Sequence, residues 1–340
     1  MRAIVWQGPE RMTVEDVPEP PDPGPGELIL RAEAVGICGS EVEGYLGHMG
    51  NRKPPLVMGH EFAGRVVAAG AGAGELEGAR VAVNPLSGCG RCALCRAGFS
   101  NVCPDRVLVG VHAPGAFADL VKVRADDARV LPDGVSARVG ALMEPLANGV
   151  HAVRLGVAGG PVERAVVLGA GTIGLVTLQA ALLSGIPHVG VLEPHGARRE
   201  RALSLGAHEA WGSPEEALSA REGLGPDLVI DAVGAEATRR FGLELLRPAG
   251  QLVCVGLAAD ATTLGFHDVV RGQHRIQGSY AYTMDDFEQA HAWLVSGEAS
   301  LGDDLPAVRP LEDGPEQFAR LAAGPPPEFK VFLAGAGRES

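Results

Sequence analysis

The sequence predicts an α/β protein of two domains, in which a β-barrel of short strands accompanies a doubly wound parallel sheet. The chain has 340 residues, which is enough for two separate hydrophobic cores. Its first part carries short apolar segments set apart by glycine and proline, a pattern typical of a compact barrel or sandwich. After Pro145, apolar strand patterns alternate with helical patterns, which indicates βαβ units.

The strands expected in the first part are short and rich in Val, Ile and Ala. They are residues 2–6, 28–35, 62–69, 80–83 and 118–123. Clusters of glycine and proline, such as residues 18–26, separate them because these residues favour turns.

The second part predicts a parallel sheet with helices on both faces. Its expected strands are residues 165–168, 189–192, 228–232 and 252–255, and its expected helices are residues 174–183, 198–205, 238–246 and 285–296. In the last helix, Phe287, Ala290 and Leu294 lie at helical spacing. Asp285 is its expected N-cap, and Gly297 is the residue expected to end it.

The composition argues against nucleic-acid and membrane partners. The formal net charge is −13, so the surface repels phosphate backbones and anionic lipids. Residues 165–184 carry no charge and are long enough to span a bilayer, but the glycine motif within them indicates a buried strand, turn and helix. The N-terminus lacks the basic and apolar run of a secretory signal, which favours a cytoplasmic location.

Residues 166–174 have the pattern of a dinucleotide-binding loop. An apolar strand leads into Gly169-Ala170-Gly171-Thr172-Ile173-Gly174, and a helical pattern follows. In such a loop the first glycine allows a tight turn, the second lets a pyrophosphate approach the backbone, and the third lets the helix pack on the strand. The free N–H groups at the start of the helix then face the phosphates.

An acidic residue at the end of the next strand, Glu193, favours NAD over NADP as the cofactor. Its carboxylate can accept hydrogen bonds from both ribose hydroxyls of the adenosine half and would repel a 2′-phosphate. His195, Arg198 and Arg199 follow closely and can partly offset that repulsion. The alternative interpretation of Glu193 is a solvated charge at a strand end.

Four cysteines predict a zinc lobe over residues 88–104. They are Cys89, Cys92, Cys95 and Cys103, on a loop that also contains glycine. Zinc takes four soft ligands in a tetrahedron, and a chain without a secretory signal favours metal binding over disulfides. Because four cysteines leave no open position, the predicted role is structural. A nucleic-acid-binding zinc ribbon would need two separated cysteine pairs and a basic surface.

Three further segments together indicate a second zinc site. Cys38 follows one strand, His60 and Glu61 precede another, and Glu144 lies at the proposed domain junction. Each is uninformative alone, but a thiolate, an imidazole and a carboxylate suit a zinc ion that keeps one position open for water or substrate.

With these motifs the chain resembles the zinc-containing medium-chain alcohol dehydrogenases, in particular the sorbitol, threonine and cyclitol dehydrogenases. The matching segments are residues 38–41, 59–61, the cysteine lobe, 144–147 and 169–174. The resemblance implies a GroES-like catalytic domain made of residues 1–148 and 285–340, with a Rossmann domain of residues 149–284 between them. It also implies two zinc ions per chain, the catalytic one held by Cys38, His60 and Glu144, with Glu61 able to coordinate or to exchange with water.

The resemblance also implies the reaction. Zinc stabilises the alkoxide of the substrate, and a hydride passes to C4 of the nicotinamide. Ser40 matches the residue that accepts the alcohol proton. Many relatives carry a histidine three residues later, where this chain has Glu43, so His48 is the nearby candidate for the outer end of the proton path. The backbone that relatives place beside the nicotinamide matches Val255, Gly256 and Leu257.

The main hypothesis is an NAD-linked dehydrogenase of a polyol, cyclitol or aminocyclitol. By the resemblance it works on a small molecule as a homodimer or homotetramer. A simple secondary alcohol or L-threonine is the alternative substrate; the polar loop 41–55, with Arg52 and Lys53, favours a hydroxyl-rich one. A catalytically silent protein that binds NAD and zinc is the alternative from another class. That alternative predicts a damaged ligand set, whereas all the zinc ligands are present.

Overall fold

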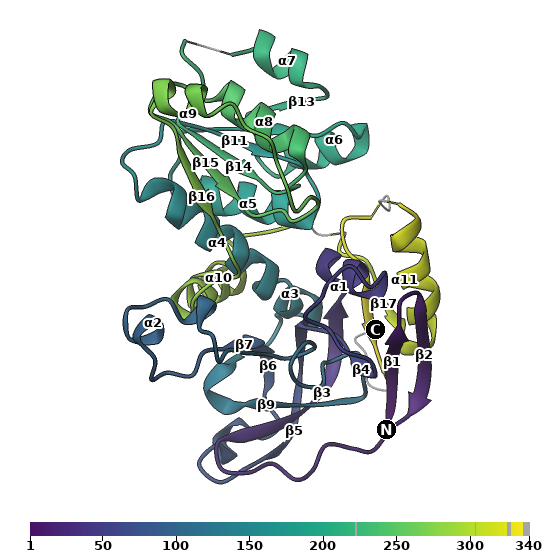
Figure 1. Ribbon diagram of the computed structural model, residues 1–340. Helices are drawn as coiled ribbons and strands as arrows, with labels where there is room; N and C mark the ends of the chain where they lie inside the picture. Colours follow the sequence, from purple (N-terminus) through teal and green to yellow (C-terminus); the bar gives the residue numbers. More distant parts are fainter. Residues whose placement is uncertain (222, 303, 325–327, 336–340) are drawn as a thin grey trace. The chain divides into compact units, whose positions relative to one another are not determined.

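The computed structural model describes residues 1–221, 223–302, 304–324 and 328–335. The chain divides into two compact units (Figure 1). The first unit combines both ends of the chain, Met1–Glu144 and Asp304–Ser340, and the second is Pro145–Asp303. Within the described ranges, no helix combines the length and the apolar character needed to cross a membrane.

The division between the units differs in detail from the expected one. The first boundary lies at Glu144 and Pro145, close to the expected residue 148, but the chain returns to the first unit only at Asp304. Helix α10 (Met284–Ser296) therefore lies in the second unit. The physical reason is its contact with helix α4 (Met143–Val157), where Asp286 of α10 binds His151.

The first unit is built mainly from antiparallel strands. Its largest sheet has the order β10-β6-β5-β3-β18-β17, and β9 also pairs with β3; a smaller sheet has the order β2-β1-β4, and β7 pairs with β8. The strands are β1 (Arg2–Gly8), β2 (Arg11–Asp16), β3 (Glu27–Gly36), β4 (Leu56–Val57), β5 (Glu61–Ala69), β6 (Arg80–Val83), β7 (Leu86–Ser87), β8 (Val107–Leu108), β9 (Leu120–Arg124), β10 (Ala128–Val130), β17 (Val308–Pro310) and β18 (Phe332–Ala334). The helices of this unit are α1 (Gly39–Tyr45), α2 (Ala93–Arg96), α3 (Ala137–Ala141) and α11 (Gly314–Ala323).

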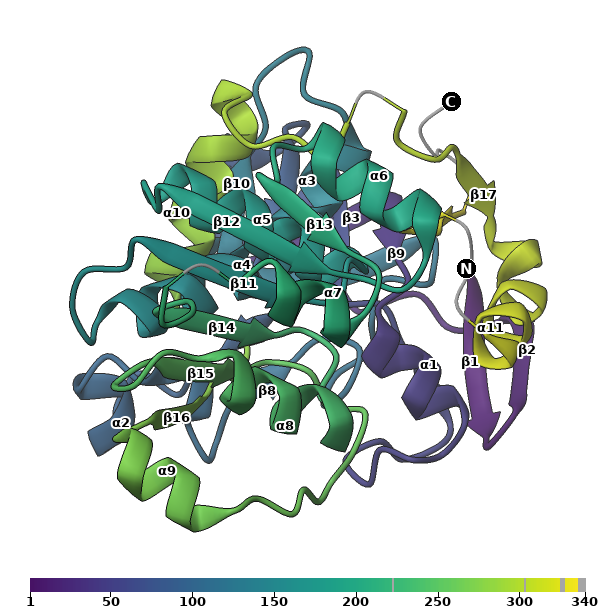
Figure 2. The same ribbon diagram turned by 90° about the horizontal axis from the view of Figure 1, so that it is seen from above.

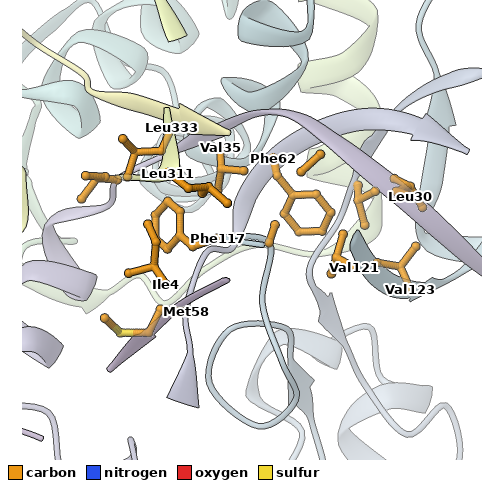
Figure 3. Close-up of a cluster of buried hydrophobic side chains, with 14 of the residues drawn as sticks. Ile4, Leu30, Val35, Met58, Phe62, Phe117, Val121, Val123, Leu311 and Leu333 are labelled. Carbon is orange, nitrogen blue, oxygen red and sulfur yellow. The ribbon is translucent and has the colours of Figure 1, made fainter. Parts of the chain in front are cut away.

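One hydrophobic core joins the two ends of the chain in this unit. Ile4, Phe62 and Phe117 pack in it together with Leu311 and Leu333 from the C-terminal segment (Figure 3). All five side chains are at most 1% exposed. Burial of each such side chain contributes about 1.5–3 kcal/mol, so the C-terminal segment is a structural part of the first unit.

The second unit contains a parallel sheet with the order β13-β12-β11-β14-β15-β16, which Figure 2 shows in sequence. The strands are β11 (Arg164–Leu168), β12 (His188–Leu192), β13 (Glu209–Trp211), β14 (Leu228–Asp231), β15 (Gln251–Cys254) and β16 (Arg275–Gly278). The helices besides α4 and α10 are α5 (Thr172–Leu183), α6 (Gly196–Ser204), α7 (Pro214–Ser219), α8 (Glu236–Leu245) and α9 (Phe266–Gly272). The strand order reverses at β11, and in such sheets ligands bind beyond the carboxyl ends of the strands at that point.

The structure contains the strands and helices expected in this unit and adds two strands, β13 and β16, and the helices α4, α7 and α9. The uncharged segment 165–184 forms β11, a turn and α5, as the glycine motif indicated. The sequence pattern missed β13 because it is only three residues long. It missed β16 because this edge strand, with Arg275, is exposed along its length and lacks an apolar run.

The start of α10 corrects one detail. Its N-cap is Thr283 and not Asp285, because the backbone N–H of Thr283 donates to the carboxylate of Asp286 over 2.8 Å. Gly297 ends the helix with a φ of +77°, as expected for a residue that must adopt the left-handed conformation.

The carboxylate of Asp286 ties α10 to α4. It is 1% exposed, and its Oδ2 lies 2.9 Å from Nδ1 of His151 and 2.9 Å from Nη2 of Arg154. Burial raises the pKa of Asp286, but the hydrogen bonds from His151 and Thr283 outweigh it, so the pKa lies below its ordinary value. The folded state therefore favours the charged carboxylate.

Asp286→Asn is expected to lower the free energy of unfolding by about 2–3 kcal/mol at pH 7, because it removes the charge that His151 and Arg154 share. A carboxyl with a depressed folded-state pKa stabilises the fold above its unfolded pKa, and this contribution is lost as the pH falls through the folded value. The difference between the variant and the wild type should therefore shrink in acid. Urea denaturation at pH 7 and near pH 3, followed by tryptophan fluorescence, measures it. Asp285→Asn, at the exposed neighbour, is the control, and equal losses in both variants would contradict the assignment.

Candidate metal centres and cofactor loop

The pairing of two strands brings a group of possible zinc ligands together. Gly36 at the end of β3 lies opposite Glu61 at the start of β5, so Cys38 comes next to His60. The ligand atoms of Cys38, His60 and Glu61 all lie within 4.8 Å of one another. A thiolate, an imidazole and a carboxylate at this separation fit a single zinc ion.

Glu41 supports this group from inside the protein. Its carboxylate is fully buried and accepts hydrogen bonds from the backbone N–H groups of Cys38 (3.0 Å) and Gly59 (2.7 Å). Its Oε1 also lies 2.9 Å from Nδ1 of His60, a close charged contact whose alignment falls short of a full hydrogen bond. A carboxylate on this side favours a proton on Nδ1, which leaves Nε2 of His60 free for a metal.

Burial and the neighbouring charges have opposite effects on the pKa of His60. Burial lowers the pKa of His60, but the carboxylate of Glu41 and the thiolate of Cys38 raise it well above its ordinary value. The folded state therefore favours the protonated imidazole, and a metal ion that binds Nε2 competes with a proton there.

A buried ion pair holds Glu61. Nζ of Lys330 lies 2.5 Å from Oε2 of Glu61 and donates to the carbonyl oxygen of Ile37, and both side chains of the ion pair are at most 2% exposed. A side chain at Gly36 would meet Oε2 of Glu61 at 2.4 Å, so the carboxylate occupies space that only glycine leaves open. Sequence analysis missed Lys330, which is 269 residues away and carries no motif.

Glu144 lies close to this centre but outside the three-residue group. It is 8% exposed at the start of α4. Burial lowers the pKa of Lys330, but Glu61, Cys38 and, to a smaller extent, the charge of Glu144 raise it above its ordinary value. Since Glu144 does not belong to the group of atoms within 4.8 Å, its role as a zinc ligand stays a prediction.

The structure places Ser40 directly beside Cys38, and no hydrogen bond between Ser40 and His48 is found among the described residues. The hydroxyl of Ser40 lies 3.4 Å from Sγ of Cys38 and 3.3 Å from Nη2 of Arg52. His48 instead contacts Glu43, with Nδ1 2.8 Å from Oε2, and both side chains are about half-exposed or more. The contact between Arg52 and Ser40 was not predicted, because sequence analysis treated Arg52 only as part of a polar loop.

The four lobe cysteines converge as their spacing predicts. All are free thiols, and their sulfur atoms lie within 4.8 Å of one another. The backbone N–H of Cys89 points to Sγ of Cys103, and that of Cys95 points to Sγ of Cys92, each over 3.4 Å. Backbone hydrogen bonds lower the pKa of Cys89 to about 6, so one thiolate is available at neutral pH.

Two glycines of the glycine loop have different physical roles: Gly174 allows close packing, and Gly171 leaves open space. Gly169 has a φ of +92°, and a Cβ on Gly174 would lie 1.9 Å from the carbonyl oxygen of Gly169, so Gly174 is needed for packing of α5. A Cβ on Gly171 would meet nothing within 4 Å. The start of α5 at Thr172 and Ile173 therefore faces a space beside Gly171 that a phosphate can enter.

Glu193 is a buried part of this loop and not a solvated charge. It is 4% exposed, and its two oxygens accept from the backbone N–H groups of Ala170 and His195, each over 2.9 Å. Arg199 donates to the carbonyl oxygens of Glu193 and Pro194, whereas Arg198 lies in the first turn of α6.

The other predicted cofactor contacts follow β15. Gly256 packs so closely that its Cβ would lie 2.1 Å from the backbone of Val233, and the neighbouring Leu257 is 69% exposed. The backbone N–H groups of Val255 and Gly256 both donate to the carbonyl oxygen of Asp231 over 2.9 Å. Contact of this segment with a nicotinamide stays a prediction.

Gly171→Ala and Gly174→Ala form a matched pair. Gly171→Ala is expected to leave the melting temperature within about 2 °C and to weaken NAD binding at least about tenfold, because its methyl group enters the phosphate space. Gly174→Ala is expected to lower the free energy of unfolding by about 2 kcal/mol, because its methyl group collides with backbone. Thermal melts and calorimetric NAD titrations measure both. Unchanged NAD affinity in a folded Gly171→Ala would refute the assignment.

Comparison with known proteins identifies the family. The model for the alcohol dehydrogenase GroES-like domain matches residues 24–133, and that for zinc-binding dehydrogenases matches residues 172–296. Human sorbitol dehydrogenase is 34% identical over 335 residues, which cover 95% of this chain and 93% of that protein. L-threonine 3-dehydrogenase of Pyrococcus horikoshii is 34% identical over 259 residues, 74% of each protein. The crystal structure of a zinc-binding dehydrogenase from Sinorhizobium meliloti bound to NADP superposes with a TM-score of 0.90 at 28% identity over 98% of each chain.

These findings confirm the predicted fold class, a GroES-like barrel domain with a Rossmann domain, and the predicted cofactors, zinc and a nicotinamide dinucleotide. The chain therefore belongs to the zinc-containing medium-chain alcohol dehydrogenases, and it is a dehydrogenase of alcohols that uses zinc and a nicotinamide cofactor.

Proposed function

We propose that this dehydrogenase exchanges a hydride between NAD and a secondary alcohol of the polyol or cyclitol class. The observation that carries the proposal is the meeting of Cys38, His60 and Glu61 within 4.8 Å, with the Ser40 hydroxyl beside Cys38. The similarity to human sorbitol dehydrogenase supports a polyol as the substrate. The similarity to L-threonine 3-dehydrogenase supports L-threonine as the second candidate.

The site residues divide the work. Cys38, His60 and Glu144 would hold the catalytic zinc, and Glu61 would be able to coordinate it or to exchange with water. Bound zinc supplies Lewis acidity toward the alcohol oxygen. Ser40 accepts the proton of the alcohol at Oγ and passes its own proton on. Because His48 is paired with Glu43 near the surface, these two residues form the outer end of the path.

Glu193 supports NAD as the preferred cofactor. Backbone N–H groups hold its buried carboxylate beside the glycine loop, and a carboxylate there accepts the ribose hydroxyls and repels a 2′-phosphate. Arg198 is the residue that can contact the adenosine half from α6. The cysteine lobe holds a second, structural zinc ion, for which the four converging sulfur atoms are the support.

The proposal extends to the state of the protein in the cell. The partner is a small-molecule substrate, with no nucleic acid and no membrane, as the net charge of −13 favours. The protein works in the cytoplasm as a homodimer or homotetramer, as is usual in the resembling family.

The zinc-loaded protein is expected to reduce NAD with at least one member of a panel of polyols, cyclitols, aminocyclitols, L-threonine and simple secondary alcohols. NADP should be used less efficiently, and a chelator should abolish the activity. Absorbance at the nicotinamide band measures the rate. A protein that binds zinc and NAD but turns over no member of the panel would favour the catalytically silent alternative.

Cys38→Ala is expected to lose at least about a thousandfold in kcat and one of two zinc ions per chain, while NAD affinity stays unchanged, because the change removes only a ligand of the catalytic metal. Cys92→Ala is the control, since it should lose the structural zinc and lower stability. Elemental analysis, NAD titration and thermal melts separate the two effects. Retained activity in Cys38→Ala would refute the proposed ligand set.

A further inference from the structure

Arg52 is a buried cation in the loop between α1 and β4. The residue is 6% exposed, and within the part of the chain that the structure describes its guanidinium makes two hydrogen bonds, both long and both to neutral groups. Nη2 lies 3.3 Å from Oγ of Ser40, and Nη1 lies 3.4 Å from Oδ1 of Asn51. Nε is fully buried, and none of the described residues forms a hydrogen bond with it.

No carboxylate of the described residues forms an ion pair with this guanidinium. Glu41 interacts electrostatically with the guanidinium of Arg52. The oxygens of Glu41, however, accept hydrogen bonds from backbone N–H groups and lie against His60. A buried charge without a partner costs several kcal/mol, whereas Arg normally meets a carboxylate or phosphate through two parallel hydrogen bonds. Arg52 therefore lacks the partner that its burial requires.

The neighbouring helix makes room for this arrangement. A Cβ on Gly44 would lie 2.6 Å from Cδ and 2.8 Å from Nε of Arg52, so only glycine in α1 allows the side chain to lie there. The same helix carries Ser40. The guanidinium is thus packed against the element that positions the proton acceptor of the reaction.

We propose that Arg52 binds an anionic group of the substrate, a carboxylate or a phosphate ester, close to the carbon that is oxidised. The inference rests on the proposed function, because Ser40 marks the position of the reacting hydroxyl. Ser40 Oγ lies 3.3 Å from Nη2, so with an ordinary hydrogen bond at each end the anionic oxygen lies at most about 9 Å from the alcohol oxygen. The substrates of this class are phosphorylated polyols and hydroxy acids, including L-threonine, whereas the cationic nitrogen of an aminocyclitol would be repelled.

The overall charge strengthens this assignment. The protein carries a formal net charge of −13, so its field repels anions. An anionic substrate therefore needs a local cation, and a desolvated guanidinium provides a far stronger attraction than an exposed lysine does. The exposed neighbour Lys53 lines a cavity of about 600 Å³ to which Arg52 does not contribute.

The first experiment compares matched neutral and anionic alcohols with the zinc-loaded wild type: galactitol with galactitol 1-phosphate, and 2,3-butanediol with 3-hydroxybutyrate. The anionic member of at least one pair is expected to have a kcat/KM at least about tenfold higher. Arg52→Gln should abolish this preference mainly through KM, and Arg52→Lys should restore part of it. Lys53→Gln, which removes the same charge from the neighbouring exposed position, should change it by less than about threefold.

A binding experiment tests the same site without turnover. Inorganic phosphate titrated into the zinc-loaded protein is expected to bind the wild type and Lys53→Gln alike, and Arg52→Gln at least about tenfold more weakly. NAD is titrated in parallel, because its pyrophosphate offers the same chemistry. A loss of NAD affinity in Arg52→Gln, with phosphate binding intact, would assign Arg52 to the cofactor and overturn the proposal.

The remaining outcomes separate this inference from the proposed function. Equal or better turnover of the neutral alcohols, together with phosphate affinity that Arg52→Gln leaves unchanged, would overturn the role of Arg52 and leave the dehydrogenase intact. Absence of turnover with every alcohol, together with phosphate binding that depends on Arg52, would refute the proposed reaction and support the anion site. If Arg52→Gln fails to fold, the kcat/KM values of the wild type for the matched substrate pairs, together with those of Arg52→Lys, still test whether Arg52 binds the anionic group.

Discussion

The arrangement of the candidate metal site in the first unit depends on the pairing of strand β3 with β5 on one side and with β18 on the other. Gly36 lies opposite Glu61 in β5 and opposite Phe332 in β18. Strand register is set by backbone hydrogen bonds and by the buried face, since a slip of one residue turns every side chain to the other face. Because of this register, Lys330 from the end of the chain meets Glu61 from its beginning. The sheet therefore positions the candidate metal ligands close to one another before a metal ion binds.

Four glycines leave space that a side chain would fill, and a different group uses or can use that space in each case. In the Rossmann loop, Gly174 allows the close approach of the backbone of Gly169, and Gly171 leaves room for a ligand. Gly36 accommodates the carboxylate of Glu61, and Gly44 accommodates the guanidinium of Arg52. The first two belong to a motif of fixed spacing and are recognisable in the sequence. The other two are recognisable only once the fold has brought distant segments together.

This difference explains how far the sequence could predict the structure. The cysteine lobe and the glycine loop are each formed by residues close together in the chain, so the residue spacing alone predicts what they bind. The alternation of strand and helix patterns predicts the fold class. Lys330 was out of reach, because its contact with Glu61 spans 269 residues and depends on β18 pairing with β3. Thr283 was missed as the N-cap of α10 because Asp285 is also a common capping residue, and the contact of the Thr283 backbone with the buried carboxylate of Asp286 is visible only in the structure. The assignment of His48 to the proton path rests on proximity along the chain, and it stays a prediction because sequence does not give the direction of a side chain on an exposed loop.

The buried charged side chains of Glu41, Glu61 and Arg52 differ in how completely the protein compensates their charges. Glu41 is surrounded by backbone N–H groups and the imidazole of His60. Glu61 has Lys330 as a direct partner. These two charges are balanced within the chain, so they orient the metal ligands whether or not substrate is present. Among the described residues, the guanidinium of Arg52 donates only to the neutral side chains of Asn51 and Ser40, and in our proposal an anionic group of the substrate completes its environment. Substrate binding and proton transfer then share one location, because the side chain that attracts the substrate also donates to the hydroxyl of Ser40.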